Sequence, residues 1–85
     1  MITREIILKN EEGLHARPAT EIAKNALNYS CDIKLDVNGK EYNAKSVIHI
    51  MSAGIKNNTQ IKIICDGENE EQALAEIVKL FENLQ

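Results

Sequence analysis

Residues 31–44 read CDIKLDVNGKEYNA and carry the clearest structural signal in the chain. Apolar and polar side chains alternate over Cys31–Val37, which is typical of a strand with one buried face. The pair Asn38-Gly39 follows, and it favours the tight turn of a β-hairpin because both central residues of that turn need positive φ. We therefore expect Lys40–Ala44 to return as an antiparallel partner strand.

The spacing of apolar residues on either side of this hairpin predicts the remaining elements. Two further strands are expected over residues 2–8 and Gln60–Asp66. Three helices are expected: over Ala16–Asn28, over Val47–Ser52, and after Asn69 with an apolar stripe that reaches Leu84. Ser46 should cap the second helix and Gly54 should end it, and Asn69 with Gln72 resembles a capping box for the third.

Both long helices show one apolar stripe each. The first stripe comprises Ala19, Ile22, Ala23, Ala26 and Leu27, and the second comprises Leu74, Ile77, Val78, Phe81 and Leu84. The order βαββαβα, with antiparallel strands that are apolar on one face, predicts an α+β fold: a two-layer sandwich with a four-stranded antiparallel sheet covered on one face by three helices. A chain of 85 residues supports one hydrophobic core, so a single domain over residues 1–85 is expected.

Composition excludes several classes of function. The chain has 10 basic and 13 acidic residues, a net charge of −3 and no basic cluster, which argues against nucleic-acid binding. No apolar run reaches the ~18 residues that span a bilayer, and the first residues lack a signal-peptide core, so no membrane contact and a cytoplasmic location are expected. Cys31 and Cys65 are expected as buried thiols in a reducing compartment rather than as a disulfide.

The stretch GLHARPA, residues 13–19, carries the chemistry. Pro18 suits the first turn of a helix and thereby places His15 at the helix N-terminus, where unsatisfied N–H groups carry a partial charge of about +0.5. That charge disfavours a second proton on His15, so we expect a neutral, nucleophilic imidazole near pH 7. A phosphoryl group on the ring would lie beside the N–H groups of Ala16 and Arg17, and the Arg17 guanidinium fits phosphate oxygens. The alternative is a simple helix cap with a solvated arginine.

These seven residues resemble the active-site signature of the HPr family, the histidine-containing phosphocarriers of the bacterial phosphotransferase system. The resemblance extends over the whole chain, including the Asn38-Gly39 hairpin, Ala44-Lys45-Ser46, Met51-Ser52 with Gly54-Ile55, and the C-terminal helix. It implies an open-faced β-sandwich. It also implies that enzyme I phosphorylates His15 at Nδ1 with Arg17 in support, and that enzyme IIA domains take the group away for sugar uptake. Such a protein is a stoichiometric carrier rather than a true enzyme, and it needs no cofactor or metal.

The resemblance gives Ser46 and the short helix further roles. In many Gram-positive members a serine kinase/phosphorylase modifies the serine at the Ser46 position, and a transcriptional regulator is a further partner; the alternative is that Ser46 is only an N-cap. The docking surface for partners would comprise Thr20, Lys24, Val47, Ile48, His49 and Met51. We expect His49 to be a surface residue of the short helix, since two histidines without a third ligand make a poor metal site. A monomer is expected.

Three residues depart from the family pattern. Glu12 stands where Asn or Ser is usual, and its carboxylate could repel the phosphoryl group or favour a second proton on His15. His49 replaces Gly or Lys, and Ala53 replaces Leu. Two alternatives to the phosphocarrier therefore stay open: a regulatory adaptor that acts through Ser46 and the short helix without phosphoryl relay, and a binding module whose motif has lost its function because of Glu12.

Overall fold

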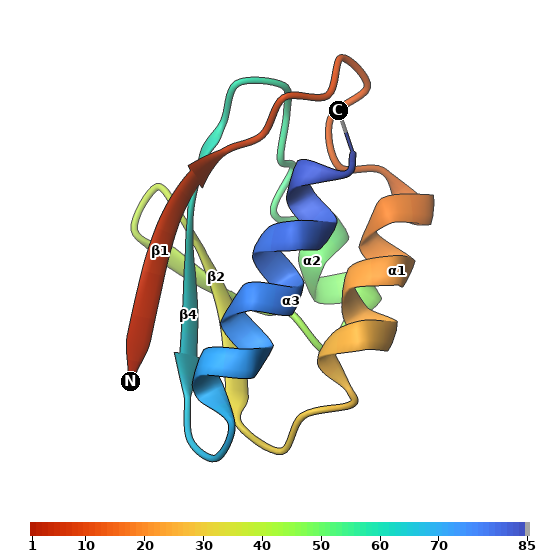
Figure 1. Ribbon diagram of the computed structural model, residues 1–85. Helices are drawn as coiled ribbons and strands as arrows, with labels where there is room; N and C mark the ends of the chain where they lie inside the picture. Colours follow the sequence, from red (N-terminus) through yellow and green to blue (C-terminus); the bar gives the residue numbers. More distant parts are fainter. Residues whose placement is uncertain (85) are drawn as a thin grey trace.

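The chain folds in the predicted order βαββαβα, as described by a computed structural model of residues 1–84. The strands are β1 (Ile2–Ile7), β2 (Asp32–Val37), β3 (Lys40–Asn43) and β4 (Gln60–Asp66), and the helices are α1 (Ala16–Ala26), α2 (Val47–Ser52) and α3 (Glu70–Glu82). All three helices lie on one side of the sheet (Figure 1). The predicted open-faced α+β sandwich is thus confirmed.

The four strands form one antiparallel sheet in the order β1-β4-β2-β3. In the central pair, Ile33 lies opposite Cys65 and Leu35 lies opposite Ile63, and all four side chains are buried under the helices. The alternate positions of β2 and β4 face outward, where Lys34 and Lys62 are exposed. The period-2 pattern of the sequence therefore identified the buried face correctly.

The hairpin between β2 and β3 has the predicted turn. Asn38 and Gly39 both have positive φ, 55° and 84°, and the strands on either side pair Val37 with Lys40. The Gly39 N–H also donates a hydrogen bond to Asp36 Oδ1 at 3.0 Å. These two turn residues and the side-chain bond fix the register of the hairpin, because the strand partners are set by the length of the turn.

The first helix ends earlier than predicted, and one residue of its apolar stripe is misassigned. Helix α1 stops at Ala26, because the N–H groups of Asn28 and Tyr29 donate to carbonyls three residues back, at 3.1 and 3.2 Å, rather than four. Leu27 directly follows the helix and its N–H still donates to the Ala23 carbonyl at 3.0 Å, but its side chain is 66% exposed. The predicted burial of Leu27 is therefore wrong, while Ala19, Ile22, Ala23 and Ala26 are buried as expected.

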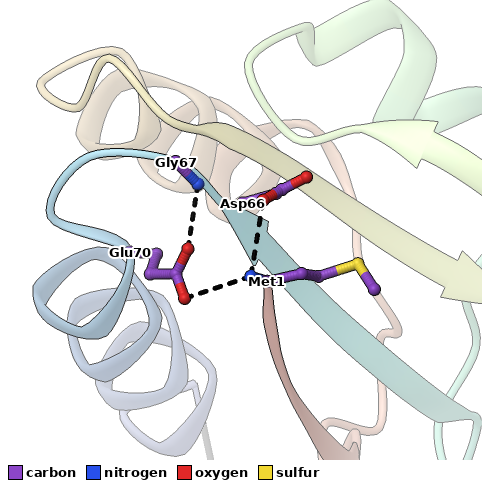
Figure 2. A network of polar contacts seen from close by, with 4 residues as sticks. All are labelled: Met1, Asp66, Gly67 and Glu70. Atoms are coloured by element: carbon purple, nitrogen blue, oxygen red, sulfur yellow. Dashed lines mark hydrogen bonds and ion pairs between the residues drawn. The ribbon is translucent and has the colours of Figure 1, made fainter.

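The third helix begins without the predicted capping box. Asn69 occupies the N-cap position, but it is left-handed (φ 62°) and its side chain makes no capping bond, since that bond needs an extended backbone. Instead Glu70 Oε1 accepts a hydrogen bond from the Gly67 N–H at 3.0 Å (Figure 2). The other Glu70 oxygen lies 3.3 Å from the Met1 amino group, which also contacts Asp66 at 3.4 Å. The Gly67 N–H and the amino group hold the pKa of Glu70 below its ordinary value.

The core lies between the sheet and the helices. Its largest fully buried side chains are Leu8, Ile22, Ile33, Leu35, Ile50, Ile61, Ile63, Ile77 and Cys65. In α3 the buried residues are Ala73, Ile77, Val78 and Phe81, so Ala73 was missed, whereas Leu74 and Leu84 are only partly buried. Within residues 1–84 no helix has the length and apolar character to cross a membrane.

Both cysteines are buried free thiols in this core, as expected. Cys65 follows Ile63 on the helix-covered face of β4, and Cys31 lies just before β2. Burial raises the pKa of the Cys65 thiol to about 11, and the neighbouring Cys31 adds to the increase. Cys65 therefore stays protonated at neutral pH.

Candidate functional site

His15 occupies the N-terminal end of α1, as the position of Pro18 predicted. It is the N-cap residue, with an extended backbone (φ −93°, ψ −171°), and its carbonyl accepts a hydrogen bond from the Ala19 N–H at 3.0 Å. The imidazole makes no capping hydrogen bond to the helix, and the side chain is 44% exposed. The ring is thus held at the positive end of the helix macrodipole and remains accessible to another molecule.

The residues just before His15 fix it to the rest of the molecule. The Leu14 side chain is buried, and its N–H donates to the Ile55 carbonyl at 2.9 Å. Gly13 has φ 70°, and a Cβ at this position would lie 2.7 Å from the Ile55 oxygen, a distance at which atoms clash. Only glycine therefore allows the chain to pass Ile55 closely and still direct His15 outward.

The first turn of α1 provides a favourable environment for an anion. The N–H groups of Ala16 and Arg17 precede the first intrahelical donor, and the turn contains no acidic residue. The Arg17 side chain is exposed, and within residues 1–84 no carboxylate lies at ion-pair distance from it. Two backbone donors and one guanidinium thus stand within two residues of the imidazole.

Glu12 lies directly beside the imidazole. Its Oε1 is 3.4 Å from His15 Nε2, and its side chain is 79% exposed. The surface around this pair is a shallow hollow between the loop before α1, the first turn of α1 and the end of α3. The hollow is lined by Asn10, Glu12, His15, Arg17, Pro18, Glu21, Asn83 and Leu84. The sequence predicted the proximity of Glu12, His15 and Arg17, but it missed the contribution of Asn10 and of the end of α3.

Ser46 caps α2 as predicted. Its backbone is extended, and its Oγ accepts a hydrogen bond from the His49 N–H at 3.2 Å. The His49 ring is turned toward β3: its Nδ1 accepts a hydrogen bond from the Asn43 N–H at 2.9 Å, and it packs edge-on against Tyr42 with the ring centroids 5.1 Å apart. His49 is therefore half-buried and attaches α2 to the sheet, rather than being a free surface side chain as expected.

The other predicted docking residues differ in exposure. Ile48 is 83% exposed and Met51 41% exposed on α2, whereas Val47 is half-buried and packs against the core. Thr20 and Lys24 are exposed on α1, which packs against α2. Two neighbouring helices thus expose some of the predicted docking residues: α2 exposes apolar side chains and α1 exposes polar ones.

Comparison with known proteins places this geometry in a family. A family model described as "PTS HPr component phosphorylation site" matches residues 2–83. The chain belongs to the HPr family. It is 42% identical over 79 residues to phosphocarrier protein HPr of Mycoplasma genitalium, and this match covers 92% of this chain and 90% of the relative. It is also 42% identical over 82 residues to the HPr of Mycoplasma pneumoniae, covering 95% and 93% of the two chains.

Solved structures of HPr proteins have the same fold. A crystal structure of HPr-C-His from Thermoanaerobacter tengcongensis is 37% identical with a TM-score of 0.94, covering 99% of this chain and 94% of the other. A crystal structure of HPr from Bacillus anthracis is 32% identical with a TM-score of 0.87, covering 93% and 94%. The chain is thus an HPr-type phosphocarrier component of the phosphotransferase system.

Proposed function

We propose that this HPr-family chain accepts a phosphoryl group on His15 from phospho-enzyme I and passes it to sugar-specific enzyme IIA domains in the cytoplasm. The observation that carries the proposal is the His15 ring, which is half-exposed at the N-terminus of α1 and makes no capping bond. A histidine that served only as a helix cap would use its ring to accept a bond from the first turn. This ring is instead available to a reacting group.

The surroundings of His15 suit a phosphoryl group. The lone pair of one ring nitrogen forms the new N–P bond while the N–P bond to the phosphohistidine of the donor breaks. The phosphoryl oxygens then lie near the N–H groups of Ala16 and Arg17 and the Arg17 guanidinium, which offset their charge. The carrier supplies positioning and charge, its partners supply the remaining catalysis, and each carrier molecule is used and regenerated stoichiometrically.

The direct test is phosphorylation by enzyme I and radiolabelled phosphoenolpyruvate. We expect acid-labile, base-stable phosphate on the protein, mapped by mass spectrometry to His15 and lost when a IIA domain is added. His15→Ala should accept no label, whereas His49→Ala, which removes the other histidine, should still be labelled at the end point. Label that persists in His15→Ala would show that the acceptor is a different residue.

Arg17 should accelerate the transfer through its charge. A hydrogen bond to a charged group contributes about 1.5–3 kcal/mol, so Arg17→Ala should slow phosphorylation about 10- to 100-fold. Arg4→Ala is the matched control, because Arg4 is also exposed but lies on β1, away from the hollow around His15. Initial rates measured with enzyme I decide the point, and equal rates for the two variants would exclude a role for Arg17.

Docking would use the exposed side chains of α1 and α2. Ile48 and Met51 offer apolar area to a partner, with Thr20 and Lys24 beside them on the neighbouring helix. We expect Ile48→Asp to raise the apparent KM of enzyme I for the carrier, because a charge placed in an apolar contact costs binding energy. We expect the carrier to act as a monomer, which sedimentation equilibrium measures.

A second candidate role is regulatory phosphorylation of Ser46. The Ser46 Oγ lies at the first turn of α2, where a phosphate is favoured near helix N–H groups. A solved structure of Crh, a catabolite repression protein of Bacillus subtilis, is 30% identical with a TM-score of 0.79, covering 98% of this chain and 95% of the other. Incubation with HPr serine kinase and ATP should label Ser46, with Ser46→Ala unlabelled and Ser52→Ala labelled. A transcriptional regulator that binds only the serine-phosphorylated form would then be a further partner.

A further inference from the structure

The two nitrogens of the His15 ring have different surroundings. Nε2 lies 3.4 Å from the Glu12 carboxylate. Nδ1 makes no capping bond to the first turn of α1, and no hydrogen bond joins it to any part of residues 1–84. One nitrogen therefore faces a negative charge, while the other has no hydrogen-bond partner within residues 1–84.

The loop holds Glu12 beside the ring. The Glu12 N–H donates to Asn10 Oδ1 at 3.0 Å, and the Gly13 N–H donates to the Asn10 carbonyl at 2.8 Å, so the residues 10–13 form a tight turn. Asn10 is itself anchored at two distant points, since its N–H donates to Asn57 Oδ1 at 3.0 Å and its Nδ2 donates to the Leu84 carbonyl at 3.2 Å. Through Asn10, the backbone of Glu12 is thus connected to two other parts of the molecule. The loop that carries the Glu12 carboxylate is therefore held in place.

A carboxylate at this distance discriminates between the two tautomers of a neutral imidazole. A proton on Nε2 faces the carboxylate directly, whereas a proton on Nδ1 is farther from it and would also meet the positive end of the helix. Both effects favour the tautomer with the proton on Nε2 and the lone pair on Nδ1.

We propose that Glu12 is a positioning residue that keeps the proton on His15 Nε2 and so makes Nδ1 the nucleophile; this inference rests on the proposed phosphocarrier function. When the Nδ1 lone pair forms the N–P bond and the donor's N–P bond breaks, the Nε2 proton stays in place and the ring becomes cationic beside Glu12. In the onward step the N–P bond breaks, its electron pair returns to Nδ1, and neutral imidazole leaves. The proton count of His15 is therefore the same before and after the cycle.

This assignment also places the phosphoryl group away from the carboxylate. The two nitrogens of an imidazole project in different directions from the ring, so a group on Nδ1 does not lie between the ring and Glu12. The Glu12 carboxylate is then closer to the cationic ring than to the phosphoryl oxygens, so its attraction to the ring exceeds its repulsion of the oxygens. The phosphoryl oxygens have the Ala16 and Arg17 N–H groups beside them. The repulsion expected from the sequence is thus reduced by the geometry of the ring.

The test is the tautomer of His15 in the unphosphorylated protein, measured by long-range proton–nitrogen NMR of the ring at a pH where it is neutral. In the wild type the Nε2–H form should dominate. Glu12→Ala should shift the tautomer ratio toward that of an unconstrained histidine by about 3- to 10-fold, as follows from removal of a charge at this distance in a solvated site. Glu11→Ala is the matched control, since it removes the same charge from the adjacent exposed position, and it should leave the ratio unchanged.

Two further measurements separate positioning from a merely structural effect. Glu12→Asp should restore part of the ratio, because it keeps the charge on a shorter side chain. In transfer assays with enzyme I, Glu12→Ala should lower kcat by less than about twofold with KM unchanged, because the fraction of rings with the reactive lone pair on Nδ1 falls only to that of an unconstrained histidine. A wild-type ratio in Glu12→Ala, or an equal shift in Glu11→Ala, would overturn the proposal. The NMR result does not depend on enzyme I, so failure of labelling in the wild type would reject the phosphocarrier function alone.

Discussion

At the scale of single residues, Gly13 shows how one position fixes the reacting group. It has φ 70°, and its Cα passes so close to Ile55 that an added Cβ would lie 2.7 Å from the carbonyl oxygen. The next residue donates its N–H to that same oxygen. Any displacement at Gly13 therefore also strains the bond that anchors Leu14, the residue immediately before His15.

We expect Gly13→Ala to destabilise the protein more than Gly39→Ala does. Both glycines have positive φ, but a Cβ at Gly39 would meet nothing within 4 Å. Gly39→Ala should therefore cost only about 1 kcal/mol, the price of a left-handed alanine. Gly13→Ala should exceed it by at least about 1 kcal/mol, because the overlap with Ile55 forces a backbone shift. Urea unfolding of both variants measures the difference, and equal costs would contradict the close approach.

The sequence predicted the placement of His15 but not the whole of its surroundings. Pro18 suits a first helical turn, and this local preference was enough to locate the N-terminus of α1 and the residues within three positions of it. The contacts of Asn10 could not be predicted in the same way. Its partners are Asn57 and Leu84, and no local pattern indicates which distant loop approaches an asparagine.

At the scale of elements, α2 depends on its cap. A helix of six residues has few intrahelical bonds, so the Ser46 Oγ bond to the His49 N–H is a large part of its stabilisation. The same short helix carries Ile48 and Met51, the exposed apolar side chains of the proposed docking surface. The stability of α2 and the shape of that surface are therefore linked.

Ser46→Ala should lower the free energy of unfolding by about 1 kcal/mol, because it leaves a helix N–H without its side-chain acceptor. Ser52→Ala is the control: its Oγ donates to the His49 carbonyl at 2.6 Å in an exposed position at the other end of α2, where water can replace the bond. Its effect should be within about 0.5 kcal/mol of zero. Thermal or urea unfolding compares the two, and a Ser46→Ala protein as stable as Ser52→Ala would argue that the cap is unimportant.

Local patterns predicted the elements better than their ends. Val47–Ser52 and Gln60–Asp66 have the predicted bounds because a cap, a stop glycine and an unbroken alternation define them. The end of α1 was wrong because the change to three-residue hydrogen bonds at Asn28 and Tyr29 leaves no sign in the apolar pattern, which continues through Leu27. The start of α3 at Asn69 was correct, but the capping box was wrong because the sequence does not reveal that Asn69 is left-handed.

At the scale of the whole molecule, the site is assembled from parts that only the complete fold brings together. The hollow around His15 combines the loop before α1 with the end of α3, which are at opposite ends of the chain. The hairpin signal could predict that β2 and β3 are neighbours, but not that β4 lies between β1 and β2. That arrangement follows from long-range pairing, and it also places the buried Cys65 on an inner strand, between Ile2 of β1 and Ile33 of β2.

The burial of Cys65 predicts how the stability of the whole fold changes at alkaline pH. In the unfolded chain the thiol loses its proton around its ordinary pKa of 9.0, whereas in the fold it keeps the proton up to a pKa of about 11. Between these values the unfolded state binds fewer protons, so the free energy of unfolding falls as pH rises, by up to about 2–3 kcal/mol. Below pH 9 this contribution to stability is fully present.

Urea unfolding of wild type and Cys65→Ala from pH 7 to 11 tests this prediction. Cys65→Ala should be less stable at pH 7 because of the cavity it creates, but its stability should fall less steeply above pH 9. Cys31→Ala should keep most of the wild-type slope, since burial is the larger cause of the raised pKa of Cys65 and Cys31 the smaller. The three proteins differ only at the substituted cysteine, so parallel curves for wild type and Cys65→Ala would mean that the thiol ionises as readily in the fold as in the unfolded chain.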